Sequence, residues 1–145
     1  SNIKISLGEI TIKSTEGAAV PNKENGYIIK NSSSSFYIEP HGFLDPKIEP
    51  ENLDVVISPV VNFGFPLGIN FIQGKSVLNT LINLFKPKLV LASTTGGDIS
   101  FKGLLNNILN VDGSYEEAKY TYKDKVSIID PKPGLRYEIN NFLNS

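Results

Sequence analysis

The sequence contains no cysteine, no methionine, no tryptophan and a single histidine, His41, among 145 residues. The absence of cysteine excludes disulfide bonds, zinc sites built on thiolates and cysteine nucleophiles. It also fits a cytoplasmic protein, because cytoplasmic proteins do not depend on disulfides. Because methionine is absent altogether, we expect the chain to be a fragment of a longer protein.

The sequence also lacks long apolar runs and any excess of charge of one sign. No stretch approaches the ~20 apolar residues that span a bilayer, and no basic segment leads into an apolar one as in a signal peptide. Lys and Arg number 14 against 15 Asp and Glu, so no nucleic acid and no membrane partner is expected. The 40% content of hydrophobic residues is typical of a globular protein, and the length predicts a single domain over residues 1–145.

The chain begins with strand patterns and continues with alternating strands and helices. Alternating apolar and polar residues around short polar turns predict antiparallel hairpins in the first part. Nearly continuous apolar strands in the second part are typical of strands covered on both faces. We therefore expect an α/β fold with a mixed sheet and flanking helices. The expected strands are 3–7, 10–12, 26–30, 36–39, 53–58, 88–92, 126–129 and 135–139, and the expected helices are 74–86, 101–111 and 115–123.

Two further patterns concern single segments. Ser114 and Glu117 are spaced as a capping box, in which a serine hydroxyl and a later glutamate satisfy each other's free amides. Residues 60–73 are punctuated by glycine and proline yet are unusually rich in phenylalanine. This run either lines a substrate mouth or partner surface, or forms the packed interior of a long connection.

Several segments follow one another in an order that is characteristic of one enzyme family. They are Asn25-Gly26-Tyr27-Ile28-Ile29, Phe36-Tyr37-Ile38-Glu39-Pro40-His41-Gly42, Leu53 to Pro59, Leu84 to Leu91, and Gly96-Gly97 before Gly103-Leu104-Leu105. In this order, over about residues 10–139, they resemble the C-terminal half of the metallo-β-lactamase-fold metallo-hydrolases of cyanobacteria and plant chloroplasts. The resemblance implies an αββα sandwich, of which this chain forms the C-terminal half and a missing N-terminal half is the partner.

The resemblance also implies a metal site, with zinc as the expected divalent cation. The family's first-half signature, His-x-His-x-Asp-His, is absent here. Of the ligands from the second half, a bridging aspartate corresponds to His41, a late histidine to Thr94, and a third position to Glu16. Threonine is a poor zinc ligand, which argues against a standard two-zinc site. Because the chain has one histidine, no cysteine and at most two nearby acids, we expect it alone to be inactive and to bind zinc no better than micromolar.

The residues themselves leave each candidate with two interpretations. His41 and Glu39 are metal ligands at a strand end if the strand continues that far, or His41 simply caps a hairpin. Asp98 and the preceding glycines form a ligand-binding anion nest, or Asp98 caps a short helix. Ser93, Thr94 and Thr95 have no nucleophile elbow around them. Asp45 and Glu49 are expected to be solvated loop acids.

Three functional hypotheses follow from these observations. The first is a fragment of a metal-dependent hydrolase that uses metal-activated water on an unknown small-molecule substrate. The second is a non-catalytic ligand- or partner-binding domain of the same fold, and the third is an unrelated α/β interaction domain. If the family relationship holds, the turns at 15–17, 39–41 and 93–98 converge on one sheet edge. An apolar face, including residues 27–38 or 60–72, then lies exposed for the other half or for self-association.

Overall fold

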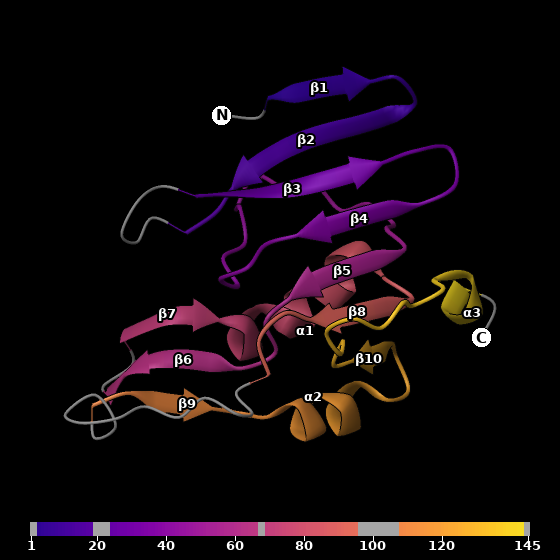
Figure 1. Cartoon of the computed structure of the whole chain (residues 1–145). Coiled ribbons are helices and arrows are strands. Elements are labelled where there is room, and N and C mark those ends of the chain that lie inside the picture. Colours follow the sequence, from indigo (N-terminus) through magenta and orange to yellow (C-terminus); the bar gives the residue numbers. More distant parts are fainter. Residues whose placement is uncertain (1–2, 19–23, 67–68, 96–107, 144–145) are drawn as a thin grey trace.

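The computed structural model describes residues 3–18, 24–66, 69–95 and 108–143 (Figure 1). Its main element is a seven-stranded mixed sheet with the order β1-β2-β3-β4-β5-β8-β10. The first four strands form an antiparallel meander, whereas β4, β5, β8 and β10 run parallel to one another. The strands are β1 (Lys4–Leu7), β2 (Ile10–Glu16), β3 (Asn25–Lys30), β4 (Ser35–Ile38), β5 (Val55–Ser58), β8 (Leu89–Ala92) and β10 (Ser127–Ile129).

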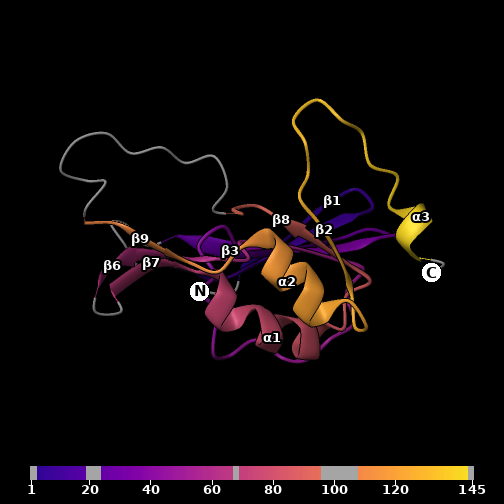
Figure 2. The same cartoon turned by 90° about the horizontal axis from the view of Figure 1, so that it is seen from below.

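Helices α1 (Gly74–Phe85) and α2 (Tyr115–Tyr122) lie on one face of this sheet (Figure 2). Apolar residues at helical spacing give α1 one buried side, formed by Leu78, Leu81, Ile82 and Phe85. These side chains form one core with a row of residues that lie side by side across neighbouring strands of the sheet. The centroid of the Phe85 ring lies 4.8 Å from that of the Tyr37 ring. The members of that row are Ile28, Tyr37, Val56, Val90 and Ile128.

The opposite face of the meander is apolar but uncovered. In β1 and β2, lysine, serine and threonine point to the helix side. On the other side lie Ile5, Leu7, Ile10 and Ile12, followed by Ser14 and Glu16 toward the carboxyl end of β2. We call this surface the bare face. It consists of Ile5, Leu7, Ile10, Ile12, Tyr27, Ile29, Phe36 and Ile38, all of which are exposed or half-buried.

The bare face ends where the parallel strands begin. On the same side of the sheet, Val55 and Leu89 are fully buried. The chain after β10 rises on that side, away from α1 and α2, and leads to the short helix α3 (Asn140–Leu143) (Figure 2). Apolar residues on both faces of β5 and β8 therefore fit their central position, as the sequence indicated.

A small second sheet lies beside the main one, with the order β7-β6-β9 (Figure 1). Its strands are β6 (Asn62–Phe65), β7 (Ile69–Gln73) and β9 (Asn110–Asp112). The phenylalanine-rich run at 60–73 thus forms a hairpin, in which Phe71 packs edge-on against Phe63 and Phe65. The interpretation of this run as a long connection was wrong.

The α/β class with a mixed sheet is confirmed, and most expected elements are present. The strand expected at 135–139 is wrong, because those residues pair with no described strand and precede α3. The helix expected at 101–111 is wrong at its end, where Asn110 belongs to β9; residues 101–107 lie outside the described residues. Stacking of two sheets into an αββα sandwich remains a prediction.

Candidate functional site

Four strand ends gather at one edge of the main sheet. Strands β2 and β4 are both antiparallel to β3, so they point the same way, and β5 and β8 are parallel to β4. The turns after residues 16, 38, 58 and 92 therefore lie at the same carboxyl edge, where α/β proteins commonly bind ligands. The expected convergence of the turns at 15–17, 39–41 and 93–95 on one edge is confirmed. Because β5 separates β4 from β8, these two strands lie about 10 Å apart.

Backbone hydrogen bonds tie these turns together in two groups. On one side, the Glu16 amide donates to Asp45 Oδ2 at 3.0 Å. On the other side, the Val60 amide donates to the Thr94 carbonyl at 3.0 Å, and the Ser93 amide donates to the Ser58 carbonyl at 3.0 Å. The edge is therefore held by main-chain hydrogen bonds and by the Asp45 carboxylate.

Glu39 organises the turn that follows β4. Its side chain is almost completely buried, and Oε2 accepts the backbone amides of His41 at 3.1 Å and Phe43 at 2.7 Å. Burial raises the pKa of this carboxyl, and the two backbone hydrogen bonds partly offset that effect. Oε1 has no hydrogen-bond partner among the described residues. Glu39 is thus a buried turn anchor with one unused oxygen.

Two glycines allow the turn after β4 to touch the start of α1. Gly42 has a φ of +73°, and a Cβ there would lie 2.5 Å from the Gly74 amide nitrogen. A Cβ on Gly74 would in turn lie 2.2 Å from the Pro59 carbonyl oxygen. Three backbone segments therefore meet without side chains between them. A hydrogen bond stabilises this contact, because the His41 carbonyl accepts the Gln73 amide at 2.8 Å.

A small buried polar group lies beneath this edge, on the helix side of the sheet. A Cβ on Gly26 would lie 2.5 Å from Thr15 Oγ1 and 3.2 Å from Glu39 Cγ, so these two side chains fill the space over the glycine. Burial and the nearby Glu39 charge raise the pKa of Tyr37. The neighbouring Thr15 hydroxyl partly offsets this rise in pKa, although the geometry between the Tyr37 hydroxyl and Thr15 Oγ1 does not complete a hydrogen bond within the described chain. The alternation of Tyr37 and Glu39 along one strand was the signal that could have revealed this group.

His41 faces Glu24, a residue that the sequence analysis did not single out. Nδ1 lies 2.9 Å from Glu24 Oε2, at a distance of ion pairing, although the angles do not complete a hydrogen bond. Both side chains are partly exposed. Strand β4 ends at Ile38, so Glu39 does not present its carboxylate beside His41 on a continuing strand. The geometry pairs His41 with Glu24 at the surface and leaves Glu39 buried underneath.

The other candidate residues from the sequence analysis differ in their position and burial. Thr94 is half-buried at the edge and engages Val60 through its backbone, while Asp98 lies outside the described residues. Asp45 is buried, which corrects its interpretation as a solvated acid. Burial alone would raise the pKa of Asp45, but backbone hydrogen bonds from Glu16 and Lys47 lower it.

No family model matches this sequence, and no curated protein is similar to it.

The geometry at the carboxyl edge supplies an incomplete ligand set. Across the described ranges, no three side chains of His, Cys, Asp or Glu lie close enough to hold a metal ion. His41 and Glu24 are two ligand types that zinc accepts, whereas zinc sites use three or four. The same ranges contain no helix long and apolar enough to cross a bilayer. What the edge offers is a histidine beside a carboxylate, in a turn held by buried Glu39.

Proposed function

We propose that this chain forms the C-terminal half of a metallo-β-lactamase-like αββα sandwich and acts as one part of a metal-dependent hydrolase of the cytoplasm. The observation that carries this proposal is the bare face. A sheet with helices on one side and an uncovered apolar surface on the other has the layers of half a sandwich. A second sheet stacked about 10 Å away would complete it.

The exposed fractions on the bare face are large for aliphatic side chains. Ile5 is 52% exposed, Leu7 61% and Ile10 42%, and Tyr27 beside them is 41% exposed. Full burial of one such side chain is worth roughly 1.5–3 kcal/mol, and contiguous apolar patches of this kind are rare on monomers. The strand positions that form the patch carry no charge. A second apolar sheet therefore fits this surface, and copies of the chain are expected to self-associate when it is absent.

In this proposal the carboxyl edge forms one wall of the active site. His41 and Glu24 lie at the rim, and the other half supplies the remaining ligands of a divalent metal, with zinc expected. When bound, such a metal generates a hydroxide from water near neutral pH. The contact with Glu24 would orient the His41 ring, while buried Glu39 would fix the turn that carries His41.

A second candidate is a non-catalytic binding domain of the same fold. Two observations favour it. Glu39 Oε2 is occupied by two backbone amides of its own turn, and Thr94, which the resemblance aligns with the family's late histidine, is a poor zinc ligand and engages Val60 through its backbone. In this case the same bare face docks the same partner, but no metal site assembles.

The test begins with the coding sequence that precedes Ser1, followed by co-expression of the segment it encodes. The hydrolase proposal expects an in-frame His-x-His-x-Asp-His and a co-purifying complex whose hydrolysis of ester or phosphodiester probes needs zinc. The substitution pair Ile12→Lys and Ile29→Lys should abolish co-purification, whereas Lys88→Gln should not. A stable complex without zinc-dependent hydrolysis would favour the binding domain, and no complex at all would overturn both.

Zinc titration of this chain alone gives an independent check. Where the structure describes the edge, His41 and Glu24 are the paired ligand types, and the expected dissociation constant is no tighter than about 1 μM, because two ligands leave half the coordination sphere to water. Isothermal titration calorimetry measures it directly, with His41→Ala as the control. A tight stoichiometric site would contradict the half-site geometry.

A further inference from the structure

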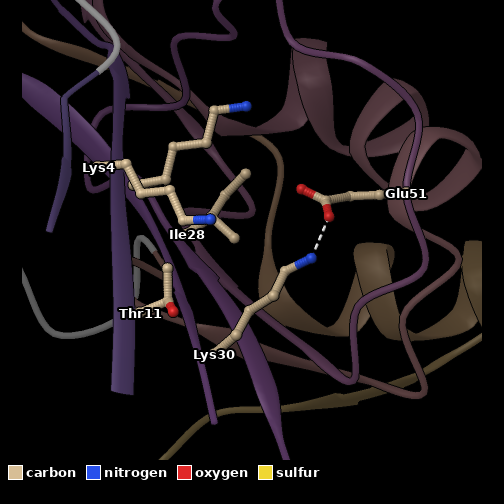
Figure 3. A pocket seen from close by; sticks show the side chains of 6 residues that line it. Lys4, Thr11, Ile28, Lys30 and Glu51 are labelled. Atoms are coloured by element: carbon tan, nitrogen blue, oxygen red, sulfur yellow. Dashed lines mark hydrogen bonds and ion pairs between the residues drawn. The ribbon is translucent and has the colours of Figure 1, made fainter. Parts of the chain in front are cut away.

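A basic hollow of about 320 Å³ lies on the helix side of the meander, beyond the helices. Its lining comes from three adjacent strands and one loop. Figure 3 shows Lys4, Thr11 and Lys30 arranged around Ile28, with Glu51 reaching in from the loop before β5. Lys13 completes the lining. This surface is opposite the bare face and does not belong to the carboxyl edge.

The sheet register places like charges beside one another here. Lys4 and Lys13 are direct cross-strand partners, and Lys13 is in turn the partner of Ile28. Lys30 stands two positions along β3 on the same face, opposite Thr11. Like charges directly opposite one another destabilise a sheet. The arrangement therefore costs stability unless something negative occupies the space between the ammonium groups.

Among the described residues that line this hollow, one is acidic. Glu51 forms an ion pair with Lys30. Within the described ranges, neither Lys4 nor Lys13 has a carboxylate partner. Three lysines and one glutamate leave a net charge of +2 in the hollow. Helix ends do not account for these lysines, unlike Lys86 and Lys123, which follow the carboxyl ends of α1 and α2, where positive charge is favourable.

The floor of the hollow is apolar. The aliphatic stems of the lysines form most of it around the buried Ile28, which is only 2% exposed, since lysine buries its methylenes while its charge stays at the rim. A volume of about 320 Å³ is at the small end of ligand sites. A fitting ligand thus combines a compact apolar body with a doubly charged oxyanion, because lysine binds phosphate as a point charge.

We propose that this hollow, lined by Lys4, Lys13, Lys30, Thr11 and Ile28, is a binding site for a small organic phosphomonoester. The oxyanion contacts the ammonium groups of Lys4 and Lys13, and the carbon body lies on the lysine stems that surround Ile28. Lys30 joins the oxyanion when it exchanges Glu51 for the ligand. The site is independent of the hydrolase proposal, since none of its residues lies at the carboxyl edge.

Phenyl phosphate is the probe, with inorganic phosphate and phenol as references, and binding is followed by titration calorimetry in low salt. Phenyl phosphate should bind saturably and more tightly than inorganic phosphate, and phenol should not bind. The double substitution Lys4→Gln and Lys13→Gln should weaken binding at least about tenfold, the effect of losing one charge-assisted hydrogen bond. It should also raise the melting temperature of the free protein, because the like-charge contact disappears. A merely structural pair of lysines would not produce both effects.

Two further variants make the test decisive. Glu51→Gln frees Lys30 and should strengthen binding several-fold. The control Lys88→Gln and Lys125→Gln changes the net charge by the same amount at another surface and should leave the affinity unchanged. The proposal is overturned if phenyl phosphate does not saturate the protein, if binding survives the Lys4 and Lys13 substitutions, or if the control loses it instead.

Discussion

At the scale of single residues, Glu39 combines two environments in one carboxyl group. One oxygen accepts two backbone amides, and the other is buried without a partner in the described chain. Replacement by alanine should cost about 2–4 kcal/mol of stability, because two hydrogen bonds to the carboxylate disappear. Replacement by glutamine keeps an acceptor oxygen and should change stability by less than about 1 kcal/mol. Chemical denaturation measures both.

The raised pKa of Glu39 gives this pair of variants a pH signature. A carboxyl that holds its proton more tightly when folded makes the folded state less stable as pH rises from its unfolded pKa, about 4.5, to its higher folded pKa. Relative to Glu39→Gln, the wild-type protein should therefore lose stability between pH 4.5 and neutrality. A wild-type protein that gains stability over that range instead would show that the backbone hydrogen bonds outweigh burial.

Gly42 allows the effect of a close approach to be separated from the effect of backbone conformation. Gly42 and Gly134 both have positive φ, +73° and +80°, but a Cβ on Gly134 meets nothing within 4 Å. Gly134→Ala should cost about 1–2 kcal/mol, the strain of the left-handed region alone. Gly42→Ala should cost about 1–3 kcal/mol more, because its Cβ overlaps the start of α1. Equal melting temperatures for the two variants would contradict this contact.

At the scale of secondary-structure elements, the helix ends carry measurable energies. Ser114 Oγ accepts the Glu117 amide at 3.1 Å, as the capping box predicted, but the Glu117 carboxylate pairs with Lys75 at 3.1 Å. The reciprocal half of the box is thus replaced by a tertiary contact. Ser114→Ala should cost about 1 kcal/mol, measured by thermal unfolding, while Thr121→Ala on the exposed side of α2 should cost little.

The C-terminal end of α1 should be improvable. Lys86 has a φ of +44°, the only positive value outside glycine among the described residues. Lys86→Gly should therefore raise stability by about 0.5–1 kcal/mol, since glycine adopts this conformation without strain. Asn83→Gly, inside the same helix and exposed, should instead lower stability by about 1 kcal/mol. A loss of stability in both variants would mean that the Lys86 side chain contributes more than its backbone costs.

How far the sequence predicted these elements depends on the kind of pattern each one has. Helix α1 was predicted from its helical periodicity, and β5 and β8 were predicted from nearly continuous apolar runs, because burial along the chain sets both patterns. The β6–β7 hairpin was missed because its register shifts between Phe63 and Gly64, which interrupts strict alternation. The burial of Asp45 depends on the distant Glu16 amide, and the approach of Glu24 to His41 joins two loops. Neither contact leaves a local sequence pattern.

At the scale of the whole molecule, the bare face should behave as an interface rather than as part of the folded core. The cross-strand pair Ile5→Thr and Ile12→Thr should reduce self-association in light scattering and lower the binding of apolar dyes. It should lower the free energy of unfolding by about 1 kcal/mol or less, because Ile5 is 52% exposed and Ile12 is only half-buried. Val56→Thr, on the buried side, should cost about 1–3 kcal/mol. Unchanged association in the first variant would show that the bare face is not the contact surface.

The order of strands in the main sheet also has a consequence for how the chain acquires its structure. Strands β1 to β4 each pair with the next in sequence, so their contacts are local, whereas β5, β8 and β10 pair only across long crossovers. Local contacts form faster than distant ones, because less chain entropy is lost before they close. The meander should therefore appear first during refolding. In that early species both of its faces are open, so the yield of refolding should fall steeply as protein concentration rises.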